Sequence, residues 1–348
     1  LEGELQEKQT QFSPEQSYMV PLNQPQYRLI KSIFERRTSL EDSIFYDVSA
    51  WTMPLAFDLQ VAPLYSTEEL QKISGEPVLD LSYPKGEMIG DRSQVGYVLE
   101  GKDYNVHQIV YALQNKGLLV KVAKKPFSIP VDGEQKEFGY GSIFIQSNFQ
   151  PVSAEEIYRQ VQSVAHKYGA SIYSLETGLT RNGIDMGSWS FNPLRQPEIL
   201  MVAGEGVRSS SAGEVWHLLD QRFGIPVVMV KPDQLSRIRL ADYNTLVLPN
   251  GRYSWGDEMA EEINHWIEEG GTLVSLERAN TWLAKHELVQ MKKKEAAKPD
   301  SSLFLPYEQQ REDRRKESIS GVILEAAIDP SHPVCYGIDD SALPVFKN

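Results

Sequence analysis

Ser174-Leu175-Glu176 and Ser275-Leu276-Glu277 place the same tripeptide at the ends of two α/β segments, residues 95–176 and 198–277. In each segment, short apolar, β-branched runs alternate with stretches of helical periodicity in the order strand, helix, strand, strand, helix, strand. This alternation is typical of parallel strands joined by right-handed crossover helices. The sequence therefore predicts an α/β fold with two tandem flavodoxin-like parallel-sheet units.

The first segment carries clear helix boundary signals. Ser153, with Glu156 three residues later, forms a capping-box pattern, and Gly169 is placed to end the same helix. The expected strands are residues 96–99, 118–123, 142–145 and 171–175, and the expected helices are 106–115 and 153–169. Between the second and third strands lies a Pro/Gly-rich excursion with no predicted strand.

The second segment repeats the order. Gly224 and the pair Gly270-Gly271 are placed to end its two helices. The expected strands are residues 199–203, 227–230, 245–248 and 272–276, and the expected helices are 212–223 and 257–269.

Three regions follow from this reading. Residues 1–85 form an N-terminal tail and irregular packing segment, with an amphipathic helix within 24–36. Residues 86–190 are the first α/β unit. Residues 191–348 are the second, with a charged, mobile insertion at about 290–318. We expect an interdomain surface in the aromatic stretch 45–58, at Phe45, Tyr46, Trp51, Pro54 and Phe57.

Composition excludes some classes of function. The net charge of −13 over 348 residues argues against a nucleic-acid-binding surface, which needs a basic face. No apolar run reaches the roughly 18 residues that a membrane-spanning helix needs. The start, Leu1-Glu2-Gly3-Glu4, does not resemble a signal peptide. The single cysteine, Cys335, rules out an intrachain disulfide and reads as a structural thiol in a β segment.

One candidate ligand site follows the first strand of the second segment. Gly204-Glu205-Gly206 precedes a serine-rich helix start at Ser209, where backbone N–H groups could hold an anion. Gly251 follows the third strand and is expected at the same edge. The alternative is a tight strand–helix turn with a serine cap and no ligand.

Glu277 is the weak candidate for catalysis, together with Glu205. It follows the last strand, where α/β hydrolases and amidotransferases place a nucleophile. Carboxylates are poor nucleophiles for acyl transfer. The alternative for Glu277, and for Glu176 in the first segment, is a carboxylate that braces a loop or caps a helix.

Two one-turn pairs resemble zinc ligands, namely His265 with Glu268 and Glu214 with His217. Around the first pair, Ile263, Trp266 and Ile267 take the apolar face of the helix, which leaves His265 and Glu268 on the polar face. Because neither pair has an obvious third ligand, we expect no metal site and no cofactor in this segment.

Three stretches resemble the C-terminal region of bacterial zinc carboxypeptidase-like proteins, whose peptidase domain is carboxypeptidase A-like. They are residues 20–27, 45–57 and 213–220. The resemblance runs from about residue 18 to the end and implies a class I glutamine amidotransferase-like domain at residues 197–285. It also implies that zinc belongs to a peptidase domain absent from this chain, and that the parent protein is periplasmic or extracellular. The position of the amidotransferase cysteine reads Leu276-Glu277-Arg278.

The leading hypothesis is a non-catalytic accessory region of such a secreted protein, with the peptidase domain as its partner. A second hypothesis is a hydrolase that uses a strand-end carboxylate pocket with Glu205 and Glu277. The third is a module that binds a peptide or glycan through exposed aromatic side chains such as Tyr253 and Trp255.

Overall fold

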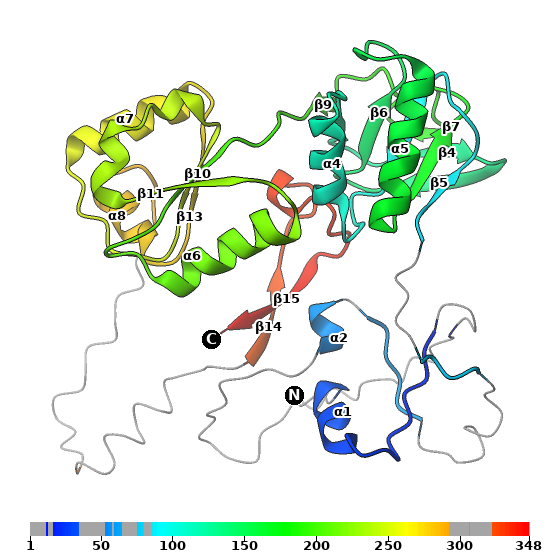
Figure 1. Cartoon of the computed structure of the whole chain (residues 1–348), viewed down its shortest axis with the longest axis horizontal. Coiled ribbons are helices and arrows are strands. Elements are labelled where there is room, and N and C mark those ends of the chain that lie inside the picture. The colour runs from blue at the N-terminus through cyan, green and yellow to red at the C-terminus, as the bar shows by residue number, and fades with distance from the viewer. Residues whose placement is uncertain are drawn as a thin grey trace. The chain divides into compact units, whose positions relative to one another are not determined.

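The computed structural model describes residues 12, 17–34, 53–57, 59–64, 75–79, 85–291, 306 and 322–347. The chain divides into two compact units. The first comprises residues 1–81, 298–328 and 341–348, and the second comprises residues 82–297 and 329–340. Each is described separately (Figure 1).

In the first unit the described elements are few. Helix α1 (Tyr27–Phe34) confirms the amphipathic helix, although it has no fully buried residue. Helix α2 (Met53–Ala56) buries Pro54. Strands β14 (Val322–Ala327) and β15 (Ala342–Lys347) pair antiparallel. The expected insertion at 290–318 lies almost entirely outside the described residues.

The second unit contains the two predicted α/β segments. The first forms a sheet, here called the first sheet, in the order β1-β7-β2-β6-β3-β9. Its strands are β1 (Glu87–Ile89), β2 (Gly96–Leu99), β3 (Lys121–Ala123), β6 (Ile143–Gln146), β7 (Ser171–Leu175) and β9 (Phe191–Pro193).

The expectation of a parallel first sheet is wrong. Only β1 and β7 pair parallel, whereas β2 pairs antiparallel with both β6 and β7, and β3 with β6 and β9. Each crossover helix does join strands of the same direction, β2 to β3 and β6 to β7. The partners are not neighbours, because a strand of the other pair lies between them. The result is the β-α-β-β-α-β split arrangement rather than a doubly wound sheet.

The first sheet is covered on both faces. Along β2, Tyr97 and Leu99 point to α4 (Val106–Asn115) and α5 (Ala154–Tyr168), whereas Val98 points to the opposite cluster. That opposite cluster is closed by the small antiparallel sheet β5-β4-β8, built from β4 (Phe127–Val131), β5 (Glu134–Phe138) and β8 (Asn182–Gly183). The alternation is that of a strand buried on both faces.

The Pro/Gly-rich excursion is therefore a β-hairpin and not an irregular segment. Strands β4 and β5 meet at Asp132-Gly133, whose φ angles of 49° and 78° are both positive. Two consecutive positive φ angles at an Asp-Gly pair are the signature of a type I′ hairpin turn.

The second segment forms the second sheet, in the order β11-β10-β12-β13, with every pair parallel. Its strands are β10 (Ile199–Val202), β11 (Val227–Val230), β12 (Thr245–Leu248) and β13 (Thr272–Ser275). Here the predicted parallel pairing is confirmed, and the strand order is that of a doubly wound sheet.

Helices lie on both faces of the second sheet (Figure 1). Leu200 and Val202 of β10 pack with α7 (Asp257–Glu268) and α8 (Ala279–Lys285). Ile199 and Met201 face the cluster that contains Ala212 of α6 (Ser209–Trp216), and Tyr111 of α4 joins this cluster. A π-helical turn, His217–Arg222, extends α6. The chain is thus a mixed α/β protein, as predicted.

Candidate functional site

The carboxyl ends of the parallel strands bring three loops of the second sheet to one edge. The loops are residues 203–208 after β10, 249–252 after β12 and 276–278 after β13. This edge is where open α/β sheets hold their ligands, because the strand ends and the helix starts meet there. We call it the carboxyl edge of the second sheet.

Asn250 links the three loops. Its backbone N–H donates to the Ser211 hydroxyl at 3.1 Å, and its carbonyl accepts from the backbone N–H of Arg208 at 2.8 Å. Its side-chain amide donates to Oε2 of Glu277. Because Asn250 is only 6% exposed, these bonds satisfy a buried polar residue and fix the loops relative to each other.

Two glycines allow the first two loops to touch. Val207 and Gly251 form an isolated antiparallel bridge, and the backbone N–H of Arg252 donates to the Gly206 carbonyl at 2.9 Å. A Cβ on Gly251 would lie 3.0 Å from that carbonyl oxygen, and Gly206 has a φ of +83°. A larger residue at position 251 would push the loops apart.

Glu277 lies between β13 and α8 with a φ of 46°, in the left-handed region. A residue with a side chain rarely adopts this conformation, and it is typical of strained turns at functional sites. The strand–turn–helix geometry is that of a nucleophile elbow, with an exposed carboxylate at the elbow position.

Three arginines surround the same space. Arg208, Arg252 and Arg278 each follow a strand-end loop, and each is exposed. An open pocket of about 440 Å³ is lined by Gly206, Val207, Arg208, Asn250, Gly251, Arg252, Glu277 and Arg278. The three arginines were not singled out from the sequence. The signal that could have found them is an arginine in the loop that follows each of three parallel strands.

The structure brings some of the predicted site residues together and leaves others outside. Gly206, Gly251 and Glu277 line the pocket, whereas Gly204, Glu205 and Ser209 are exposed nearby without lining it. The expected serine cap is wrong, because Arg208 is the N-cap of α6 and makes no side-chain capping bond. The Ser211 hydroxyl instead serves Asn250.

The expectation of exposed aromatic side chains at Tyr253 and Trp255 is also wrong. Both pack against the core of the second sheet, with their rings 4.7 Å apart. The Tyr253 hydroxyl donates to the Pro249 carbonyl at 2.7 Å, and the Trp255 indole donates to the Pro232 carbonyl at 2.8 Å. Burial raises the pKa of Tyr253 far above its usual range. These side chains are structural and offer no open aromatic platform.

The paired zinc-like residues lie on helix surfaces. His265 and Glu268 are exposed, as expected, and His265 Nε2 lies 3.4 Å from Glu269. His217 and Glu214 are exposed as well. Within the described ranges, no three His, Cys, Asp or Glu side chains are grouped as metal ligands.

The other residues predicted from the sequence lie elsewhere. Glu176 is exposed just past β7, and Cys335 is half-buried in the short 3₁₀ helix Pro333–Cys335 rather than in a β segment. Of the expected interdomain surface, Phe45, Tyr46 and Trp51 lie outside the described residues. Pro54 is buried and Phe57 is 48% exposed.

Comparison with protein-family models, with curated proteins and with solved structures found no match to this chain. Among the helices that the structure describes, none is long and apolar enough to cross a membrane.

Proposed function

We propose that this chain is a non-catalytic accessory region of a secreted zinc carboxypeptidase-like protein, in which the carboxyl edge of the second sheet binds a ligand without transforming it. The observation that carries the proposal is Glu277. It occupies an elbow with a strained backbone, and its carboxylate accepts a hydrogen bond from Asn250.

The chemistry of this elbow favours binding. A carboxylate is a weak nucleophile for acyl transfer and needs an adjacent base or acid to act in hydrolysis. The described residues that line the pocket around Glu277 are glycines, arginines, a valine and an asparagine, and none of them is a histidine or cysteine. Arginine stays protonated at any ordinary pH and serves as an anion receptor rather than as a general base.

In this proposal the peptidase domain is the partner and the site of zinc, and the protein is periplasmic or extracellular. These points rest on the resemblance at residues 20–27, 45–57 and 213–220. The amidotransferase-like domain of that family corresponds to the second sheet and its helices.

Deletion of residues 18–60 tests the partner. The second compact unit contains both sheets and none of these residues, so amide hydrogen exchange in both sheets should be unchanged. Docking to a separately expressed peptidase domain of the parent protein should be lost. Docking of the deletion variant with wild-type affinity would overturn the accessory role.

The strained elbow keeps the hydrolase hypothesis as a second candidate. If Glu277 were a catalytic group, the purified chain would hydrolyse peptides or esters and Glu277→Gln would abolish that turnover. Glu262→Gln, on the exposed face of α7 outside the pocket, is the matched control.

A further inference from the structure

The pocket at the carboxyl edge of the second sheet has a charge opposite to that of the whole chain. The protein carries a net charge of −13. Its pocket nevertheless collects Arg208, Arg252 and Arg278 against the single carboxylate of Glu277. A local concentration of one sign of charge in a concave site attracts ligands of the other sign.

The three guanidinium groups are not consumed by ion pairs with the described part of the protein. The ion pairs found there involve Lys102, Lys136, Arg159, Arg239, His265 and His286. Glu277 is bound by Asn250. Three guanidinium groups that line one pocket repel one another, and an anion shared among them would relieve that repulsion.

Backbone groups reinforce the positive field. Helix α6 starts at Ser209, directly after Arg208, and its first turn contains no acidic residue. The N-terminus of a helix carries a partial positive charge and unpaired N–H groups. The start of α6 therefore adds to the three arginines rather than opposing them.

From this arrangement we infer that the pocket is a receptor for a small oxyanion, a carboxylate or phosphate group, which Arg208, Arg252 and Arg278 hold together. Guanidinium groups recognise both groups through paired N–H donors. Glu277, held by Asn250, limits the excess positive charge of the empty pocket. The inference rests on the part of the proposed function that assigns ligand binding to this edge, and it does not need the peptidase domain.

Calorimetric titration of the purified chain with sodium phosphate and with sodium succinate, at constant ionic strength, tests the receptor. We expect saturable binding of at least one of the two. Binding of phosphate alone, of succinate alone or of both supports the site and identifies the oxyanion that it prefers. Absence of binding by both overturns it.

Substitutions locate the binding. Each of Arg208→Gln, Arg252→Gln and Arg278→Gln should weaken the affinity by about 10-fold or more, because each removes charge-assisted hydrogen bonds. All three residues are exposed, so the fold should survive, and circular dichroism checks this. Arg237→Gln should bind as the wild type does.

Glu277→Gln gives a change of opposite sign. Removal of the only carboxylate that lines the pocket should tighten oxyanion binding by about 3- to 10-fold, since like charges repel across the site. Wild-type affinity in all three arginine variants would overturn the inference, even if the protein bound phosphate elsewhere. Failure of the unmodified chain to dock to a peptidase domain would count against the accessory role and not against the oxyanion receptor.

Discussion

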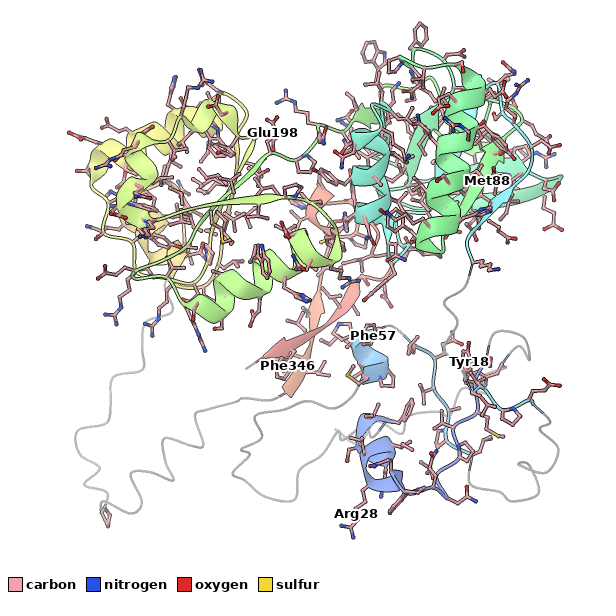
Figure 2. The ribbon with its side chains drawn as sticks, viewed as in Figure 1. Tyr18, Arg28, Phe57, Met88, Glu198 and Phe346 are labelled. Carbon is pink, nitrogen blue, oxygen red and sulfur yellow. The ribbon has the colours of Figure 1, made fainter. Side chains whose placement is uncertain are left out.

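The side-chain amide of Asn250 donates a hydrogen bond to Oε2 of Glu277, and this bond joins the ends of β12 and β13 across 27 residues of sequence. The buried amide of Asn250 thus holds the exposed carboxylate of Glu277 in place at a strained turn. Figure 2 shows the side chains of the second sheet in place, with Glu198 labelled just before β10. The bond therefore fixes the Glu277 carboxylate at the edge where open α/β sheets hold their ligands.

Asn250→Ala should destabilise the protein by about 1–3 kcal/mol, because it removes a charge-assisted hydrogen bond and leaves a small cavity. Glu277→Gln should cost less, since an amide oxygen can still accept from Asn250. Urea denaturation of the two variants measures the difference in free energy of unfolding. An unchanged free energy of unfolding in Asn250→Ala would show that the Asn250–Glu277 bond does not hold the loops.

Glu100 and Lys136 form the second electrostatic feature, near the first sheet. Their side chains lie 2.7 Å apart, are 21% and 29% exposed, and the Lys136 ammonium lies 4.4 Å from the centre of the Tyr173 ring. Burial alone would raise the pKa of Glu100, but Lys136 and Lys102 together lower it below its usual value. Burial likewise opposes the charge of Lys136, and Glu100 outweighs it to raise the pKa of Lys136.

The pH dependence of stability follows from the directions of these two pKa shifts. The contribution of Glu100 to the stability of the folded protein is complete above its unfolded pKa of 4.5. It is lost as the pH falls through the lower pKa that Glu100 has in the folded protein. The contribution of Lys136 to stability is complete below its unfolded pKa of 10.5. It is lost as the pH rises through the higher pKa that Lys136 has in the folded protein. Stability measured from pH 3 to pH 6 should therefore rise less steeply in Glu100→Gln than in the wild type, and an unchanged slope would contradict the pairing.

Lys136→Met should destabilise by about 1 kcal/mol at pH 7, because a partly buried carboxylate loses its nearest partner while Lys102 remains 3.3 Å away. The double variant Glu100→Gln/Lys136→Met should recover part of the loss. A double-mutant cycle in urea measures this coupling, and strict additivity would show that the two charges do not interact.

Two glycines at which a Cβ would meet no neighbouring atom test the assigned backbone conformations. Gly133 has a φ of +78° in the β4–β5 turn, and a Cβ there would meet nothing within 4 Å. Gly133→Ala should therefore cost about 1 kcal/mol through backbone strain alone. Gly213, within α6 and equally open, provides the matched control, and Gly213→Ala should stabilise by about 0.5–1 kcal/mol. Melting temperatures that shift in the same direction would contradict the assigned turn.

The fold was predictable where local signals decide it. The parallel second sheet followed from apolar runs separated by helices, and Gly169 ends α5 in the left-handed conformation, as its sequence position indicates. The pairing of the first sheet was not predictable in this way. A crossover helix fixes the relative direction of the two strands that it joins, but it does not fix which strand lies between them.

The candidate site, too, was only partly predictable from the sequence. Glycines and Glu277 at strand ends pointed to the edge where the pocket lies, because the carboxyl ends of parallel strands meet at one edge of a sheet. The convergence of Arg208, Arg252 and Arg278 depends on the strand order and on the bridge between Val207 and Gly251, which local sequence does not encode. Likewise, the sequence predicts exposed side chains for Tyr253 and Trp255, although tertiary packing half-buries both.

The size and activity of the native gene product test the central claim most directly. An antibody to this chain should detect a polypeptide longer than 348 residues that contains a zinc carboxypeptidase-like domain and hydrolyses peptides. The purified chain alone should bind an oxyanion and show no turnover. A native product of 348 residues that hydrolyses its substrate, with turnover lost in Glu277→Gln, would contradict the account.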